Sequence, residues 1–395
     1  MVVLNDRRQR RGHRRAVAAL PAVAVLAVAL LASLLLASCS AFRDEEATGA
    51  TEPLAPVPGA EPATASPDDE GVDPEVVASV ADHAERQGAD CFLVARNGRI
   101  IFDETWRGTG PDDPHGVFSV TKSIASMLIG ILVADGKLAI DDRVSDHVPA
   151  WRDGTHDAIT IRQVLSMTTG LERPDADYLN LAESQDRTAT ALALPVVAAP
   201  GSTWAYSNGA VQVLDAVVEA VAGEPTDEFA AERLFGPLGM DHTALHIDDA
   251  GNSTLAFGAT TTCRDLARFG QLVLERGRWG DEQIVEEAWI DASTSSSSEL
   301  NEGYGLLWWL NLEGRRLSSA LAVSTDADEV IGTGRQVPDA PESLVWALGL
   351  GDQILQVDPG TQTVVVRVGR GQALDEPDRF DERATARIVT EGIER

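Results

Sequence analysis

The chain has 395 residues, 44% of them hydrophobic, which is enough for one large globular domain with additional terminal segments. Its formal net charge is −30. Only one of its 62 acidic residues but six of its 32 Lys and Arg residues lie in the first 38 positions, so the remainder carries −35. A surface with this charge repels phosphate backbones and argues against nucleic-acid binding.

The first 38 residues have the organisation of a secretory signal. Six arginines lie between residues 7 and 15, and an apolar run follows over residues 16–37. The run ends in Leu36-Ala37-Ser38-Cys39, which resembles the bacterial lipobox and implies cleavage before Cys39 and its lipid modification. The alternative is an uncleaved transmembrane helix, because the run is about long enough to span a bilayer. Both interpretations place the rest of the chain on the extracytoplasmic face of the cell membrane.

The folded part is expected to begin after a linker. Residues 39–73 are rich in Ala, Pro, Glu and Thr without apolar periodicity, which predicts a disordered segment and a folded domain over residues 74–395. Apolar runs around Asn97-Gly98 predict a β-hairpin. Helical periodicity predicts helices over residues 73–87, 119–135, 159–167, 209–223, 226–235, 263–276 and 383–391. Further strands are expected over residues 305–310, 344–348 and 363–368.

This order of elements predicts an α/β fold of the α+β type. One antiparallel sheet would be built from both ends of the chain and flanked by helices, with a mostly helical inserted subdomain over about residues 125–260. The functional site is expected between the two parts, where clefts usually form. Cys91 and Cys263 would pair in an oxidising compartment or remain two buried thiols, and the sequence leaves both possibilities open. It also leaves the oligomeric state open.

The first chemical motif is Ser119-Val120-Thr121-Lys122, at the start of an apolar helix. One helical turn separates Ser119 from Lys122, so the two side chains share a face. A serine hydroxyl needs a neighbouring base to become a nucleophile, and a partly desolvated lysine can serve. The alternative is a capping serine and a solvated lysine. The apolar character of the helix and the presence of only one other lysine, Lys137, favour the chemical interpretation.

The second motif is Tyr206-Ser207-Asn208, just before a helix. A phenol beside an ammonium can shuttle a proton, and an asparagine amide can hold a substrate carbonyl. The alternative is a core tyrosine and a helix-capping asparagine. His242 and His246 have the spacing of zinc ligands on a helix, but they follow a turn-like Pro-Leu-Gly-Met segment, so no metal and no cofactor are expected.

Five segments together resemble the serine β-lactamase-related superfamily, over about residues 75–370. This superfamily includes class C β-lactamases, D-Ala-D-Ala carboxypeptidases, related esterases and 6-aminohexanoate-dimer hydrolases, and the chain looks closest to the last group. The segments are Phe118-Ser-Val-Thr-Lys-Ser-Ile, Ile161-Arg-Gln-Val-Leu-Ser-Met-Thr-Thr-Gly, Pro200-Gly with Tyr206-Ser-Asn, Pro237-Leu-Gly-Met and Arg264-Asp-Leu-Ala-Arg-Phe-Gly.

The resemblance implies roles for individual residues. Ser119 would be acylated, Lys122 and Tyr206 would move protons, and Asn208 would contact the substrate amide. In the group that the chain resembles most, a loop tyrosine also contacts substrate. Tyr178 could match it, with a surface tyrosine as the equally favoured alternative.

A third motif of this superfamily, Lys-Thr-Gly or His-x-Gly, has no match here. The corresponding strand edge is expected over residues 347–353, which contain no Lys or His. A cation for a penicillin-type carboxylate is therefore missing, although the backbone N–H of Leu350 could still contribute to an oxyanion hole. The sequence thus predicts a serine hydrolase for small esters or amides. The alternative is a catalytically weak, penicillin-binding-like lipoprotein that binds peptidoglycan or another ligand.

Overall fold

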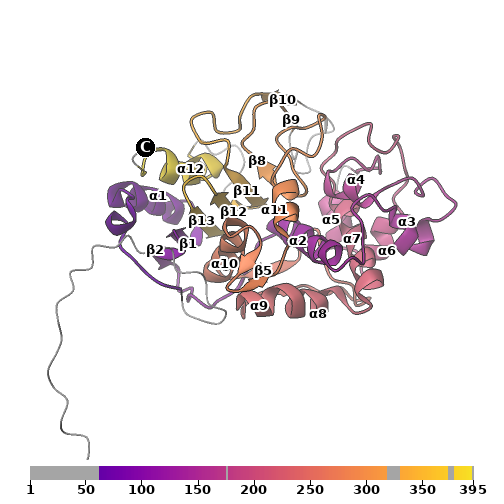
Figure 1. Cartoon of the computed structure of the whole chain (residues 1–395), viewed down its shortest axis with the longest axis horizontal. Helices are drawn as coiled ribbons and strands as arrows, with labels where there is room; N and C mark the ends of the chain where they lie inside the picture. Colours follow the sequence, from indigo (N-terminus) through magenta and orange to yellow (C-terminus); the bar gives the residue numbers. More distant parts are fainter. Residues whose placement is uncertain (1–61, 175–176, 318–329, 372–377, 394–395) are drawn as a thin grey trace, which may run out of the picture. The chain divides into compact units, whose positions relative to one another are not determined.

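The computed structural model describes residues 62–174, 177–317, 330–371 and 378–393 (Figure 1). The predicted signal segment and Cys39 lie outside these ranges. None of the helices within them is long and apolar enough to cross a membrane. The predicted linker is described from residue 62 onward, and this end packs on the domain: Thr64 bridges Ile100, and the Val72 side chain is buried. The folded domain therefore begins before residue 74.

A six-stranded antiparallel sheet forms the centre of the described chain, in the order β2-β1-β13-β12-β11-β8. Its strands come from both ends of the chain, as predicted. Their bounds are β1 Ala89–Arg96, β2 Arg99–Thr105, β8 Trp309–Leu310, β11 Val345–Gly349, β12 Gln353–Asp358 and β13 Thr363–Gly369. The turn between β1 and β2 contains Asn97 and Gly98, both with positive φ, which confirms the predicted hairpin.

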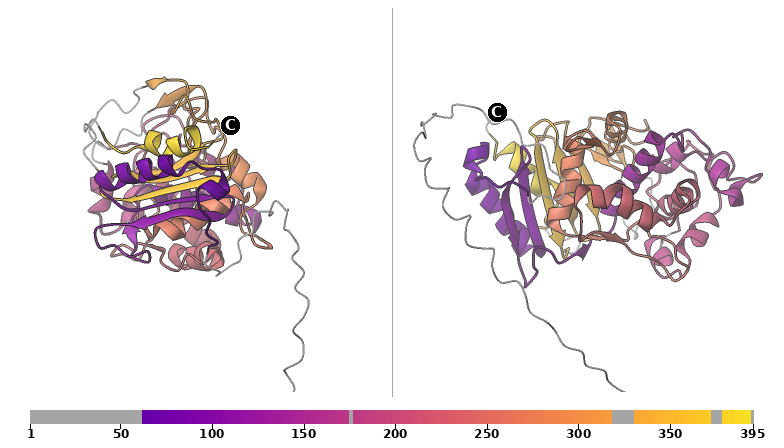
Figure 2. Two further views of the ribbon diagram at one scale, coloured as in Figure 1. Left: turned by 90° about the vertical axis from the view of Figure 1, so that its left-hand side faces the viewer. Right: turned by 60° about the horizontal axis from the view of Figure 1, so that its bottom comes forward.

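Helices cover both faces of the sheet, so its central strands are apolar on both sides. Val365 faces the cluster formed with α1 (Pro74–Arg86) and α12 (Glu382–Thr390), which lie together on one face (Figure 2). Val364 and Val366 belong to the cluster that contains α2 (Val120–Ala134) and α10 (Cys263–Leu274). The mixed fold predicted from the sequence is confirmed.

The chain between the sheet-forming ends is mainly helical. The remaining helices are α3 Val144–His147, α4 Ile161–Leu165, α5 Asp177–Ala182, α6 Arg187–Leu192, α7 Asn208–Ala222, α8 Thr226–Ala230, α9 Gly236–Leu238 and α11 Glu287–Ser293. Short strand pairs accompany them: β3 His115–Gly116 and β4 Ala244–Leu245 on either side of β5 Ala259–Thr261, β6 Arg278–Trp279 with β7 Glu282–Gln283, and β9 Arg315–Leu317 with β10 Val330–Thr333.

Three predicted elements differ from the structure. The strand expected over 305–310 is reduced to β8, because Leu307 has a φ of 65° and Gly305 N–H donates to Trp308 C=O in a tight turn. The helix over 226–235 is α8 followed by a π-helical turn over Ala231–Phe235. The strand edge expected over 347–353 is instead the end of β11, a turn containing Leu350, and the start of β12.

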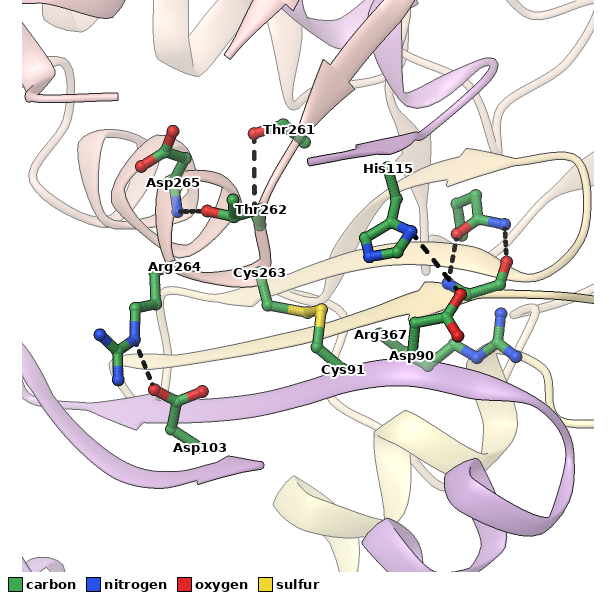
Figure 3. Close-up of a disulfide and its surroundings, with 12 residues drawn as sticks. Asp90, Cys91, Asp103, His115, Thr261, Thr262, Cys263, Arg264, Asp265 and Arg367 are labelled. Atoms are coloured by element: carbon green, nitrogen blue, oxygen red, sulfur yellow. Dashed lines mark hydrogen bonds and ion pairs between the residues drawn. A yellow bond between two sulfur atoms is a disulfide. The ribbon is translucent and has the colours of Figure 1, made fainter. Parts of the chain in front are cut away.

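Cys91 and Cys263 form a disulfide, with their Cα atoms 6.2 Å apart (Figure 3). The bond joins β1 to the first residue of α10 across 172 positions of sequence. The sequence left open whether these two cysteines pair or remain free thiols, and the structure shows that they pair. Beside this disulfide, the Arg264 guanidinium of α10 donates to the Asp103 carboxylate of β2 at 2.7 Å, so a second link joins the same helix to the sheet.

Candidate active site

Ser119 lies in the tight connection between β3 and α2. The preceding residue, Phe118, has a φ of 47°, which is strained for a residue with a side chain. Ser119 occupies the N-cap position of α2, yet its side chain makes no capping hydrogen bond. The interpretation of Ser119 as a helix cap is therefore wrong. Its half-buried hydroxyl instead accepts a hydrogen bond from Lys122.

Lys122 is buried, with 1% of its surface exposed. Its Nζ donates to Ser119 Oγ at 2.9 Å, to Asn208 Oδ1 at 2.7 Å and to the Ala256 carbonyl at 2.6 Å. Burying an ammonium is costly unless hydrogen bonds replace its hydration, and these three acceptors do so. Lys122 is thus held against the serine, and the solvated-lysine interpretation is wrong.

Tyr206 and Asn208 reach the same point from the start of α7. Ser207 caps this helix by accepting from the Ala210 N–H, which frees the Asn208 side chain to bind Lys122. Asn208 is therefore not the helix cap. The Lys122 ammonium lies 4.9 Å from the centre of the Tyr206 ring. The structure thus brings together four side chains that are up to 89 positions apart in the sequence.

An aromatic wall surrounds Tyr206. The half-buried Trp309 ring stacks on it at 5.7 Å, and Tyr304 meets both rings edge-on. Complete burial, with a smaller contribution from the charge of Tyr206, raises the pKa of Tyr304 well above its ordinary value. Tyr304 therefore keeps its proton, whereas the Tyr206 ring lies beside the Lys122 ammonium. The stacking of Trp309 on Tyr206 was not predicted from the sequence, although the adjacent tryptophans Trp308 and Trp309 are evident there.

The end of β11 runs close to the segment that leads to Ser119. A Cβ at Gly349 would lie 2.2 Å from the Val117 carbonyl, so only glycine permits this approach. The next residue, Leu350, lies in the β11–β12 turn rather than on the strand. Buried side chains hold this turn: Gln353 Nε2 donates to the Leu350 carbonyl at 3.2 Å, and Arg367 donates to the Gly351 carbonyl at 2.8 Å. The oxyanion role of Leu350 stays a prediction.

In the part of the chain that it describes, the structure does not connect two further candidate residues, Tyr178 and His242, with the contacts around Lys122. Tyr178 belongs to the first turn of the short helix α5, not to a loop, and its side chain lies outside the described part of the structure. His242 Nε2 is 3.7 Å from the Asp112 carboxylate. In the described ranges, no group of three or more His, Cys, Asp or Glu side chains could hold a metal ion.

The polar face of α7 continues behind Asn208 to Asp215, which sequence analysis missed. Its carboxylate accepts from Thr188 Oγ1 at 2.7 Å. Burial raises the pKa of Asp215 from 3.8 to about 6, against the opposing effect of hydrogen bonds from Thr188 and Thr226. Buried helix positions are expected to carry uncharged side chains. No motif in the sequence indicated that the acidic Asp215 lies at such a position.

The raised pKa gives a pH-dependent stability. Between about pH 4 and pH 6 the unfolded chain releases the Asp215 proton while the folded chain keeps it, so the free energy of unfolding falls as pH rises. The loss is on the order of 2–3 kcal/mol. Asp215→Asn removes this dependence. Its Tm relative to the wild type should increase from pH 4 to pH 7, and a Tm difference that is independent of pH would contradict the assignment.

Comparison with known proteins places this site in a family. The family model described as Beta-lactamase matches residues 76–390. The chain belongs to the beta-lactamase family. Members of this family include serine hydrolases, and the chain's resemblance to them was predicted from its motifs.

Individual relatives of this beta-lactamase family member differ in activity. The 6-aminohexanoate-dimer hydrolase of Paenarthrobacter ureafaciens is 26% identical over 72% of this chain and 73% of its own length. Esterase EstB of Burkholderia gladioli is 33% identical, over 38% of this chain and 44% of the esterase. A penicillin-binding protein homologue from Caulobacter crescentus shares the fold, with a TM-score of 0.59 and 21% identity over 81% of this chain and 97% of that structure.

Proposed function

We propose that the protein is an extracytoplasmic serine hydrolase that cleaves an ester or amide bond of a small substrate through an acyl-enzyme on Ser119. One observation carries the proposal: the buried Lys122 ammonium group bonds both Ser119 Oγ and Asn208 Oδ1. This contact places the hydroxyl beside the Lys122–Tyr206 pair, which can accept its proton once the pair has released one proton, and beside an amide that can orient a substrate carbonyl.

The reaction would follow from these contacts. After the Lys122–Tyr206 pair has released one proton to solvent, it accepts the Ser119 proton as Oγ forms a bond to the carbonyl carbon. The scissile C–O or C–N bond then breaks, and the proton passes to the leaving alcohol or amine. Water attacks the acyl-enzyme with the same pair as base, which releases the acid and restores the serine. The Ser119 backbone N–H, at the N-cap of α2, would donate a hydrogen bond to the developing oxyanion.

A matched substrate series tests the proposal. p-Nitrophenyl esters and p-nitroanilides with the same acyl groups should be hydrolysed, with a burst of p-nitrophenol equal to the active-site concentration if deacylation is slower than acylation. Hydrolysis of neither series by folded protein would instead favour a ligand-binding lipoprotein. That alternative draws support from the absence of Lys and His over residues 347–353.

β-Lactams should be poor substrates. Their carboxylate needs a cation at the third motif, and the Arg335 guanidinium is engaged elsewhere, by the Ala340 carbonyl at 2.8 Å and the Glu313 carboxylate at 3.4 Å. We expect kcat/KM for a chromogenic cephalosporin to be roughly 10–200-fold below that for the best ester, because a charge-assisted hydrogen bond contributes roughly 1.5–3 kcal/mol. Equal values for the two substrates would overturn this expectation.

We also propose export and lipid anchoring at Cys39. The lipobox-like sequence supports it, and the Cys91–Cys263 disulfide fits an oxidising compartment. Intact-mass analysis of the membrane fraction should find a lipid-modified chain that begins at Cys39, and Cys39→Ala should release the protein from the membrane fraction. A mass that retains residues 1–38 would exclude the lipoprotein.

A further inference from the structure

Gln212 of α7 lies one helical turn behind Asn208 and has no place in the mechanism above. We infer that Gln212 is a positioning residue for Lys122, which it orients through the chain segment 253–256. The inference rests on the proposed function, because it concerns the base of that reaction. The Gln212 amide forms its hydrogen bonds with Thr188 and Ser253 rather than with Ser119 or Lys122, so Gln212 would act on Lys122 through this segment.

The Gln212 side chain is completely buried. Its Nε2 donates to the Ser253 carbonyl at 2.7 Å and to Thr188 Oγ1 at 3.0 Å. A side chain of α7 therefore holds the backbone of Ser253, just before the turn over residues 255–257.

The segment after Ser253 presents the carbonyl that binds Lys122. Residues 255–257 form a turn, and the Thr254 N–H at its start donates to the His246 carbonyl at 2.8 Å, so this backbone bond and Gln212 together hold the start of the turn. The Ala256 carbonyl, three residues after the held position, accepts from Lys122 Nζ at 2.6 Å. If the start of the turn moves, the Ala256 carbonyl moves with it, and Lys122 loses one of the acceptors that orient it toward Ser119.

The hydrogen bonds of Gln212 show which of its groups is required. Both bonds use Nε2, whereas the buried Oε1 has no hydrogen-bond partner within the described residues. A side chain that only filled space at this position would need no hydrogen-bond donor. A donor facing the Ser253 carbonyl is required for holding the segment, so a side chain of similar size without an N–H should fail.

Two variants of Gln212 test the inference. Gln212→Met keeps the volume and removes the donor, and Gln212→Glu puts a carboxylate oxygen against the Ser253 carbonyl. Both should lower kcat for the best ester by roughly 10–100-fold, with KM changed less than about threefold, because orientation of the base matters and substrate contact does not. Both should also shift the acidic limb of the kcat/KM profile, which reports the base.

Gln271→Met is the matched control. Gln271 is also a buried helical glutamine, but its Nε2 donates to Glu275 of its own helix at 2.9 Å. This variant should lose a comparable amount of Tm while keeping the wild-type rate and pH profile. Thr188→Val, which removes the second partner of Gln212, is a milder variant if the Gln212 variants do not fold. It should lower kcat by at least about threefold with the same shift of the acidic limb.

The outcomes separate the inference from the proposed function. Variants that lose Tm but keep the wild-type kcat and pH profile would overturn the positioning role while leaving the acyl-enzyme intact. Wild-type protein that neither hydrolyses the ester nor reacts with a fluorophosphonate would instead overturn the proposed function itself.

Discussion

Replacing Ser119 by alanine is expected to lower ester and amide hydrolysis by at least about 10⁴-fold, because the Ser119 hydroxyl that Lys122 contacts is the group that forms the acyl intermediate. The fold should survive, since the Ser119 hydroxyl makes no capping bond to α2 and its loss should cost less than the roughly 1 kcal/mol of a capping serine. Initial rates with p-nitrophenyl esters and thermal unfolding measure the two effects.

Ser126→Ala provides the control for this variant. Ser126 lies on the same helix and is fully buried, and its Oγ has no hydrogen-bond partner in the described ranges. The same chemical change at this position should leave the rate within about twofold of the wild type, because only Ser119 meets Lys122. A folded Ser119→Ala variant with wild-type activity would show that the nucleophile lies elsewhere.

Lys122→Met should lower the rate by about 10³–10⁴-fold. The variant removes the base and leaves two buried acceptors, Asn208 Oδ1 and the Ala256 carbonyl, without their donor. Stability should change by only about 1–3 kcal/mol, because the cost of the unpaired acceptors is partly offset by no longer burying an ammonium. Single-turnover acylation rates, with Tm measured in parallel, test both statements.

The sequence offers one natural control, since the only other lysine is Lys137. Its exposed ammonium lies 3.8 Å from the Asp135 carboxylate, so Lys137→Met should leave the acylation rate unchanged.

Tyr206→Phe should lower the rate by about 10²–10⁴-fold. The double Lys122→Met, Tyr206→Phe variant should lose little more than the worse single variant, because both groups serve one proton path. Multiplicative losses would contradict a shared path.

Local patterns predicted those parts of the site that depend on local chemistry. The apolar helix and the single-turn spacing of Ser119 and Lys122 were sufficient to place both on one face. The hairpin at Asn97-Gly98 followed from a turn that requires positive φ. These features are encoded within a few residues.

Features that depend on tertiary packing could not be predicted in this way. The Ala256 carbonyl is a backbone group, so its contact with Lys122 leaves no mark on residue identity. The turn at Leu350 interrupts an apolar run that also fits a continuous strand, and the buried Arg367 that stabilises the turn lies on a different strand. The role of Gln212 arises from contacts 24 and 41 positions away.

The site of covalent modification tests the central claim most directly. Protein treated with a fluorophosphonate and digested should carry one adduct on the peptide containing Ser119, with fragmentation placing it on that residue. The Ser119→Ala variant should carry none, while the Ser126→Ala variant should react like the wild type. An adduct on a different serine, or hydrolysis that continues while Ser119 stays unmodified, would contradict the assignment of Ser119 as the nucleophile.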